Sequence, residues 1–281
     1  MSSELLLHIT TLYSVYHAYI ILSLGILGNI ITFLVFTGLK LFRGNRSAFF
    51  LSIESIANIL YALVSLSLTI LTSIYGDDRT DSSDTWCKIK FMLAQVFLLI
   101  TYFMICCAAA DQFFSTSYFF ERQHCCTMRV AQIAAFTMIC IWTVHSIIFA
   151  LFFQVKPLVG CVIGNPIAVE YGSFFFYPVL AGFMPILTAV VFSLLAYRNV
   201  RRIVRRQIPI ARRRLDRQMT AMVFVRVLCF LCLIFPYNFS RIYAINNPVP
   251  ITQPYSYAVS QLVQIVFLSF VRINSAVISI F

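Results

Sequence analysis

The chain has 281 residues, of which 60% are hydrophobic and 11% are charged, and its mean hydropathy is +0.88. Soluble domains are about 45–50% apolar and about 25% charged, so this composition excludes a soluble globular protein and indicates that much of the apolar surface faces lipid. The net charge of +11 does not indicate nucleic-acid binding, because the basic residues cluster in short segments between apolar runs, as membrane orientation signals do.

The length of the apolar runs determines the fold class. A membrane-spanning helix needs about 20 mostly apolar residues. Lipid-exposed backbone must also satisfy its own hydrogen bonds, which favours helices over strands. We therefore predict an all-α membrane protein, a seven-transmembrane helix bundle that forms a single domain over residues 1–281. The expected spans are 12–38, 48–74, 87–118, 129–153, 171–198, 217–245 and 253–281.

The loops between these spans differ in charge. The first, third and fifth loops are rich in Lys and Arg, most of all the segment 198–217. The second loop is acidic over residues 77–84, and the sixth, at residues 246–254, carries no charge. Because Lys and Arg favour the cytoplasmic side, we predict that the N-terminus lies outside and the C-terminus inside. The basic segment 198–217 is also expected to contact anionic lipid.

Nine residues stand at characteristic places along the spans and the outer loop, in the order Asn29, Cys87, Asp111, Trp142, Cys161, Pro185, Phe230, Pro236 and Asn274. In this order and placement they resemble the rhodopsin-like family of G-protein-coupled receptors over nearly the whole chain. Glu54 lies beside the position where that family has an acidic residue, and Ser55 occupies that position.

The resemblance implies a disulfide between Cys87 and Cys161, which would lie on the outer side of the membrane. It also implies that Asp111, Gln112 and Phe113 stand where the family has Asp-Arg-Tyr on the side that meets the G protein. Gln112 cannot form the ion pair that the family's arginine makes, although it can still donate hydrogen bonds. The resemblance therefore predicts the fold better than it predicts the activation mechanism.

Three charged residues lie inside predicted spans, where an unpaired charge costs at least about 2.5–3.5 kcal/mol. They are Glu54, Arg226 and Arg272. One interpretation is that Glu54 pairs with Arg226 or with Arg272. The alternative is that the arginines extend toward the inner headgroups.

Polar residues in the outer halves of the spans are candidates for a ligand pocket. Arg241 favours an anionic ligand, so we expect a peptide or an anionic small molecule. The resemblance argues against an amine, because the third span has Ala94 at the family's acidic position, and against retinal, because no lysine follows Lys156. The candidates are Gln95, Tyr177, Tyr237, Asn238, Arg241, Gln261 and Gln264.

We conclude from the sequence that the protein is a receptor rather than an enzyme, needs no cofactor and resides in the plasma membrane. Its expected partners are an extracellular ligand, a heterotrimeric G protein and membrane lipid. A seven-helix binding protein that does not couple to a G protein is the first alternative, and a membrane transporter is the second. The sequence ends at Phe281, without the family's eighth helix, so we expect a fragment or a truncated member.

Overall fold

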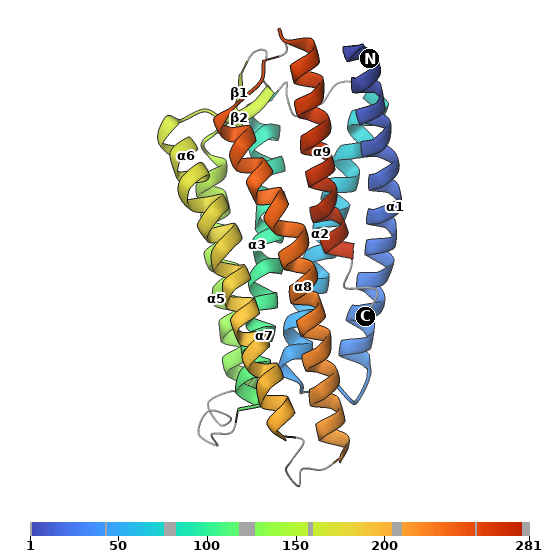
Figure 1. Ribbon diagram of the computed structural model, residues 1–281, viewed down its shortest axis with the longest axis vertical. Coiled ribbons are helices and arrows are strands. Elements are labelled where there is room, and N and C mark those ends of the chain that lie inside the picture. Colours follow the sequence, from blue (N-terminus) through green and yellow to red (C-terminus); the bar gives the residue numbers. More distant parts are fainter. Residues whose placement is uncertain are drawn as a thin grey trace.

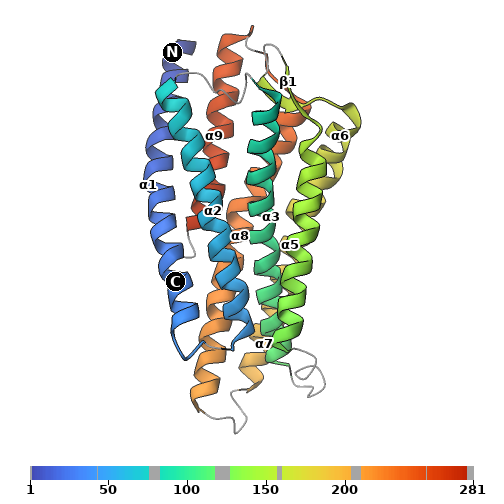
Figure 2. The ribbon, with the colours of Figure 1, turned by 180° about the vertical axis from the view of Figure 1, so that it is seen from behind.

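The computed structural model describes residues 2–42, 44–75, 83–117, 127–156, 160–203, 210–250 and 252–276. These residues form an elongated bundle of roughly parallel and antiparallel helices, with a short β-hairpin at one end (Figures 1 and 2). The N-terminus lies at the same end as the hairpin (Figure 1). We call this the hairpin end, and the other the opposite end.

Seven helical segments are long and apolar enough to cross a membrane, which confirms the predicted fold class. The first helix begins at Ser3, before the start of the predicted first span. Helix α8 begins at Ile210, and its candidate membrane span is Arg217–Asn246. The helices are α1 (Ser3–Gly38), α2 (Arg46–Tyr75), α3 (Asp84–Ser115), α5 (Met128–Ala150), the continuous series α6 (Pro166–Glu170), η2 (Tyr171–Phe183) and α7 (Met184–Ile203), α8 (Ile210–Asn246) and α9 (Pro254–Ala276).

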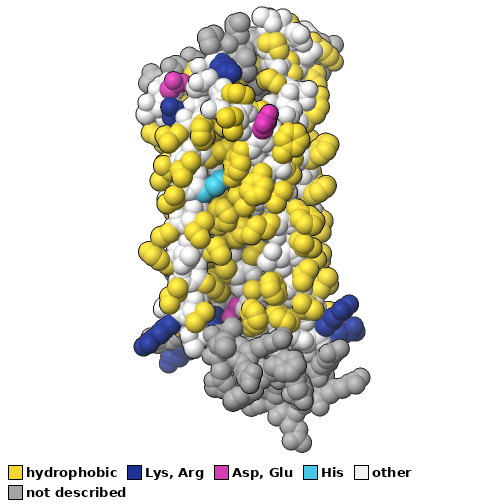
Figure 3. Space-filling view, turned by 90° about the vertical axis from the view of Figure 1, so that its left-hand side faces the viewer, with side chains coloured by type: hydrophobic (Ala, Val, Ile, Leu, Met, Phe, Trp, Pro, Cys, Tyr) yellow, Lys and Arg dark blue, Asp and Glu magenta, His cyan; other side chains and the backbone are white. Residues whose placement is uncertain are grey.

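Apolar side chains cover most of the bundle's side between its two ends (Figure 3). Lysine and arginine side chains gather at the lower edge of this face, which is the opposite end of the bundle (Figure 3). A wide exposed apolar belt of this kind is costly in water but is solvated by lipid chains. The surface therefore agrees with the multi-pass membrane protein that the composition predicts.

Helix α3 runs through the middle of the bundle and packs against α2, α5, α7 and α8. Two aromatic contacts anchor it. Phe103 stacks on Trp142 of α5 with ring centroids 4.2 Å apart, and Tyr102 packs against Phe230 of α8 at 4.9 Å. Such ring pairs contribute beyond the area they bury, so α3 is held on both sides at the same level.

The fifth span is irregular over a longer stretch than the sequence analysis expected. We predicted an interruption at Pro185, whereas the π-helix η2 extends from Tyr171 to Phe183 and contains Pro178. Pro185 has no N–H, so the carbonyl of Ala181 loses its α-helical donor. The side-chain amide of Asn238 on α8 donates to that carbonyl at 3.0 Å, so a side chain from another helix satisfies the broken position.

The hairpin is tied to the start of α3. Its strands β1 (Phe153–Lys156) and β2 (Gly160–Ile163) pair antiparallel. Cys161 of β2 forms a disulfide with Cys87 of α3, which confirms the expected pairing. The backbone N–H of Val155 also donates to the Asp84 carboxylate at 2.7 Å, so covalent and polar contacts together hold the hairpin over the bundle.

We expect Cys161→Ser to lower the unfolding temperature of the purified protein, because loss of a native disulfide typically costs about 2–5 kcal/mol. Circular dichroism during heating measures this effect without a thiol reagent. Cys140→Ser is the matched control, since Cys140 is a free, exposed cysteine on α5. Equal unfolding temperatures for Cys161→Ser and Cys140→Ser would contradict the structural role of the bond.

Candidate functional site

A cavity of about 540 Å³ lies in the half of the bundle nearest the hairpin. Its walls come from α1, α2, α3, η2, α8 and α9. A volume of this size lies within the range of small-molecule sites, which is about 300–1,000 Å³. The cavity is therefore the candidate ligand site of the described chain.

All of the predicted pocket residues except Gln264 line this cavity. Gln264 instead donates to Ser260 on its own helix at 3.1 Å. Gln261, three residues earlier on the same helix face, lines the cavity instead. The residues that do line the cavity are Gln95, Tyr177, Tyr237, Asn238, Arg241 and Gln261.

Arg241 lies among aromatic rings on its side of the cavity. The carbon at the centre of its guanidinium is 5.7 Å from the centroid of the Tyr177 ring and 5.9 Å from that of Phe91. A cation over aromatic faces at this distance is stabilised by the ring quadrupoles. Its Nε has no hydrogen-bond partner among the described residues, so the group keeps donor capacity.

Arg272 also lines the cavity, and the sequence analysis did not place it there. Its Nη1 donates to the Ser14 carbonyl of α1 at 3.4 Å, and its Nη2 donates to Thr69 of α2 at 3.3 Å. It neither pairs with Glu54 nor extends toward the inner headgroups. The helical spacing of α9 could have indicated this position. It puts Arg272 on the same face as Gln261 and Leu268, and all three line the cavity.

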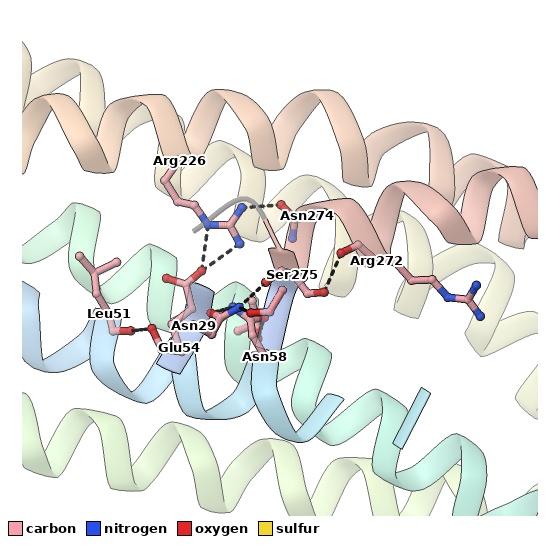
Figure 4. Close-up of polar contacts among 11 residues, drawn as sticks. Asn29, Leu51, Glu54, Asn58, Arg226, Arg272, Asn274 and Ser275 are labelled. Carbon is pink, nitrogen blue, oxygen red and sulfur yellow. Dashed lines mark hydrogen bonds and ion pairs between the residues drawn. The ribbon is translucent and has the colours of Figure 1, made fainter. Parts of the chain in front are cut away.

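Below the cavity, a buried ion pair joins α2 to α8. The Glu54 Oε1 atom lies 2.9 Å from both Nε and Nη2 of Arg226, and Arg226 Nη1 donates to Asn274 of α9 at 2.6 Å (Figure 4). Glu54 is 0% exposed and Arg226 is 3% exposed. The first of the two proposed pairings of Glu54 is therefore confirmed, and Asn274, whose contact was not predicted, brings in a third helix.

A second polar chain passes beside this ion pair and corrects the assignment of Ser55. Asn29 of α1 donates to the Ser275 carbonyl at 2.8 Å, and Asn58 of α2 reaches Asn29 at 3.4 Å (Figure 4). Thr101 of α3 donates to Asn58 at 3.0 Å. Ser55 is buried but bonds only to a carbonyl of its own helix. Asn58, nearly one turn further along α2, is thus the polar residue that meets α1 and α3.

The predicted Asp-Gln-Phe motif forms a third polar cluster near the opposite end. Arg46, at the start of α2, pairs with Asp111 at 2.8 Å, and the Ser47 hydroxyl donates to the same carboxylate at 2.6 Å. Gln112 donates to Ser47 at 2.7 Å and accepts from Thr220 of α8 at 3.1 Å. Gln112 therefore bridges α2 and α8, and Asp111 is neutralised by an arginine from another helix.

The remaining sequence candidates have packing or backbone contacts. Phe113 packs near Phe192 of α7, with centroids 5.6 Å apart. The Pro185 carbonyl accepts from the Cys106 thiol at 3.2 Å. Pro236 lies inside α8. Arg46, Ser47 and Thr220 were missed by the sequence analysis, because single polar residues near helix ends carry no signal of their partners.

Comparison with protein-family models identifies the family of the chain. The model for the seven-transmembrane receptors of the rhodopsin family matches residues 28–277. The chain belongs to that family. A search of curated proteins found no significant match. This family member is thus a seven-helix bundle with a cavity near the hairpin end and three polar clusters between the cavity and the opposite end. Among its described residues, no group of three or more His, Cys, Asp or Glu side chains could hold a metal ion.

We expect Glu54→Arg and Arg226→Glu each to reduce the amount of receptor at the cell surface. Each single change leaves two like charges buried together, and breaking a buried pair costs about 3–5 kcal/mol. The double variant Glu54→Arg/Arg226→Glu restores an ion pair, so it should recover surface level. Flow cytometry of a tagged receptor measures this.

Arg129→Glu is the control for the charge exchange, since Arg129 is exposed at the start of α5. Its surface level should stay close to that of the wild type, because exposed charges contribute little. A double variant no better than the weaker single variant would show that the pair does not stabilise the fold.

Proposed function

We propose that the protein is a receptor that binds an extracellular ligand in the cavity and passes the signal to a heterotrimeric G protein at the opposite end. Its membership of the rhodopsin family supports the general class. One structural observation carries the proposal. Helix α8 lines the cavity with Tyr237, Asn238 and Arg241 in its second half, and is bound to other helices through Thr220 and Arg226 in its first half. A helix that contacts both places can couple them.

Two independent features support an outward-facing hairpin end. The disulfide Cys87–Cys161 lies there, and structural disulfides form in oxidising compartments. The basic residues Lys40, Arg129, Arg198 and Arg201 belong to the loops and helix ends of the other side, where the cytoplasmic surface is expected. The plasma membrane is the compartment in which such a receptor meets an external ligand.

The orientation predicts the accessibility of epitope tags. A tag before Ser3 should bind antibody on intact cells, and a tag after Phe281 should bind only after permeabilisation. The disulfide and the positive charges both support an outer N-terminus. Labelling of the C-terminal tag on intact cells would contradict this orientation.

The relative strengths of the contacts indicate which one restrains α8. The Gln112–Thr220 hydrogen bond is between neutral groups and is worth about 0.5–1.5 kcal/mol. Separating Glu54 from Arg226 would leave buried charges unpaired, at about 3–5 kcal/mol. We infer that this ion pair, rather than the Asp-Gln-Phe motif, is the main restraint on the movement of α8 that admits a G protein. Ligand binding would shift the balance between two packings of the helices.

The chemistry of the cavity disfavours an amine ligand. Ala94 lines the cavity where amine receptors of the family have an acidic residue, and no Asp or Glu is among the described lining residues. The second candidate function, a binding protein that does not couple, is favoured by Gln112, which forms no ion pair. The two candidates differ in one measurable property, which is activation of G proteins.

We expect the double variant Glu54→Leu/Arg226→Met to raise basal G-protein activation above that of the wild type at equal surface level. It removes the ionic restraint without burying a lone charge, and a loss of one or two kcal/mol changes the ratio of the two packings by about 5- to 30-fold. G-protein dissociation sensors for each of the main classes in cells measure this. Gln112→Arg should also raise activation, because the family's arginine at this position contacts the G protein once the sixth span moves outward.

The control is Arg129→Gln, which changes an exposed charge outside the three polar clusters. It should leave basal activation unchanged. If the double variant and Gln112→Arg both reach the surface and activate no class of G protein, the coupling proposal fails and the binding protein is the better description.

A further inference from the structure

The described lining of the cavity carries positive charge without a carboxylate. Arg241 and Arg272 both line it, and the described lining residues include neither Asp nor Glu. Apolar and aromatic side chains such as Phe91, Phe176 and Leu268 supply much of the rest of the wall. A ligand that fits such a site has an apolar body and a negative charge.

Arg272 is less well paired than Arg226, which also lies inside the bundle. Its side chain is 4% exposed, yet its two hydrogen bonds are long, at 3.3 and 3.4 Å, and both acceptors are neutral. Its Nε has no partner among the described residues. Arg226, by contrast, has a carboxylate and an amide oxygen at 2.6–2.9 Å. A guanidinium has five N–H donors, so Arg272 retains donors for an incoming anion.

The cavity holds one further buried donor. Tyr102 lines it, is 2% exposed, and its hydroxyl has no partner among the described residues. Thr69 also lines the cavity, but its hydroxyl already donates to the Ser65 carbonyl at 2.9 Å. Buried polar groups are normally paired, so an unpaired hydroxyl and an incompletely paired guanidinium in one cavity indicate a site for a polar group of a ligand.

We propose that Arg272 anchors the ligand and that the ligand is a small organic anion with an apolar or aromatic body. The inference rests on the proposed function and names the ligand class of the same cavity. The oxyanion would accept hydrogen bonds from the guanidinium, in the charge-assisted geometry that arginine makes with carboxylates. The apolar body would occupy the space toward Phe91 and Phe176, where Arg241 also lies.

Arg272 lies on the same turn of α9 as Asn274 and Ser275, which bond to other helices. The Ser275 hydroxyl donates to the Arg272 carbonyl at 2.8 Å, and the Ser275 carbonyl accepts from Asn29 at 2.8 Å (Figure 4). Asn274, the next residue, accepts from Arg226. An anion that draws the Arg272 side chain would therefore act on the same turn that holds Arg226 and Asn29.

The test uses purified receptor in nanodiscs without any G protein. The probes are 3-phenylpropionate and its neutral analogue 3-phenylpropionamide, with sodium chloride matching the ionic strength. Binding is followed by the rise in unfolding temperature with probe concentration. We expect the acid to bind about 10- to 100-fold more tightly than the amide, as charge-assisted hydrogen bonds allow. Equal affinities, or no binding of the acid, would overturn the proposal.

Two variants assign the preference to Arg272. In Arg272→Gln the acid and the amide should bind equally, while the control Arg129→Gln should keep the wild-type ratio. Leu268→Glu places a carboxylate four residues before Arg272, where the two side chains can pair on one helix face. It should also abolish the preference, and it keeps the test valid if Arg272→Gln does not fold. A preference that survives in Leu268→Glu, or that is lost only in Arg241→Gln, would show that Arg272 is not the anchor.

Failure of this inference and failure of the proposed function are distinguishable. If the receptor prefers the acid in nanodiscs, but Glu54→Leu/Arg226→Met and Gln112→Arg activate no G protein in cells, the results would support the anion site in a protein that does not couple. Raised basal activation in Glu54→Leu/Arg226→Met without acid preference would support the receptor and reject the anion anchor.

Discussion

The contact on which the rest of the structure depends is the buried ion pair of Glu54 and Arg226. Each charge would be costly inside a helix bundle alone, because the membrane offers no water to solvate it. Their pairing, completed by Asn274, fixes the rotation of α2, α8 and α9 about their own axes. The neighbouring chain from Asn29 through Asn58 to Thr101 then aligns α1 and α3 with the same level of the bundle.

This ion pair also changes where the receptor holds α8. In the family that the chain resembles, an arginine after the motif's aspartate pairs with acids in the resting state. Here Gln112 occupies that position and makes only neutral hydrogen bonds, while Arg46 of α2 neutralises Asp111. The strong ionic contact to α8 lies instead at Arg226, nearer the middle of the bundle. This contact therefore lies closer to the cavity than the Asp-Gln-Phe motif does.

The sequence predicted the number of spans and the fold class well, because length and hydropathy are local properties of each run. It also led to the disulfide, through the family resemblance. It was less successful with positions. The contacts that join α2 to α1 and α3 come from Asn58 rather than from Ser55, and Gln264 bonds to its own helix while Gln261 lines the cavity. Each pair is three residues apart and so shares a helix face, and only the level along the helix decides which residue meets the neighbouring helices.

By itself, the sequence determined that this protein crosses a membrane seven times as helices, because apolar runs of this length have few other stable states in lipid. It also required that Glu54, Arg226 and Arg272 find partners or a cavity, because buried charge is expensive. Only the tertiary structure decided between those outcomes. It paired Glu54 with Arg226 and left Arg272 facing the cavity, since the choice depends on how helices far apart in sequence rotate and pack, which no local pattern encodes.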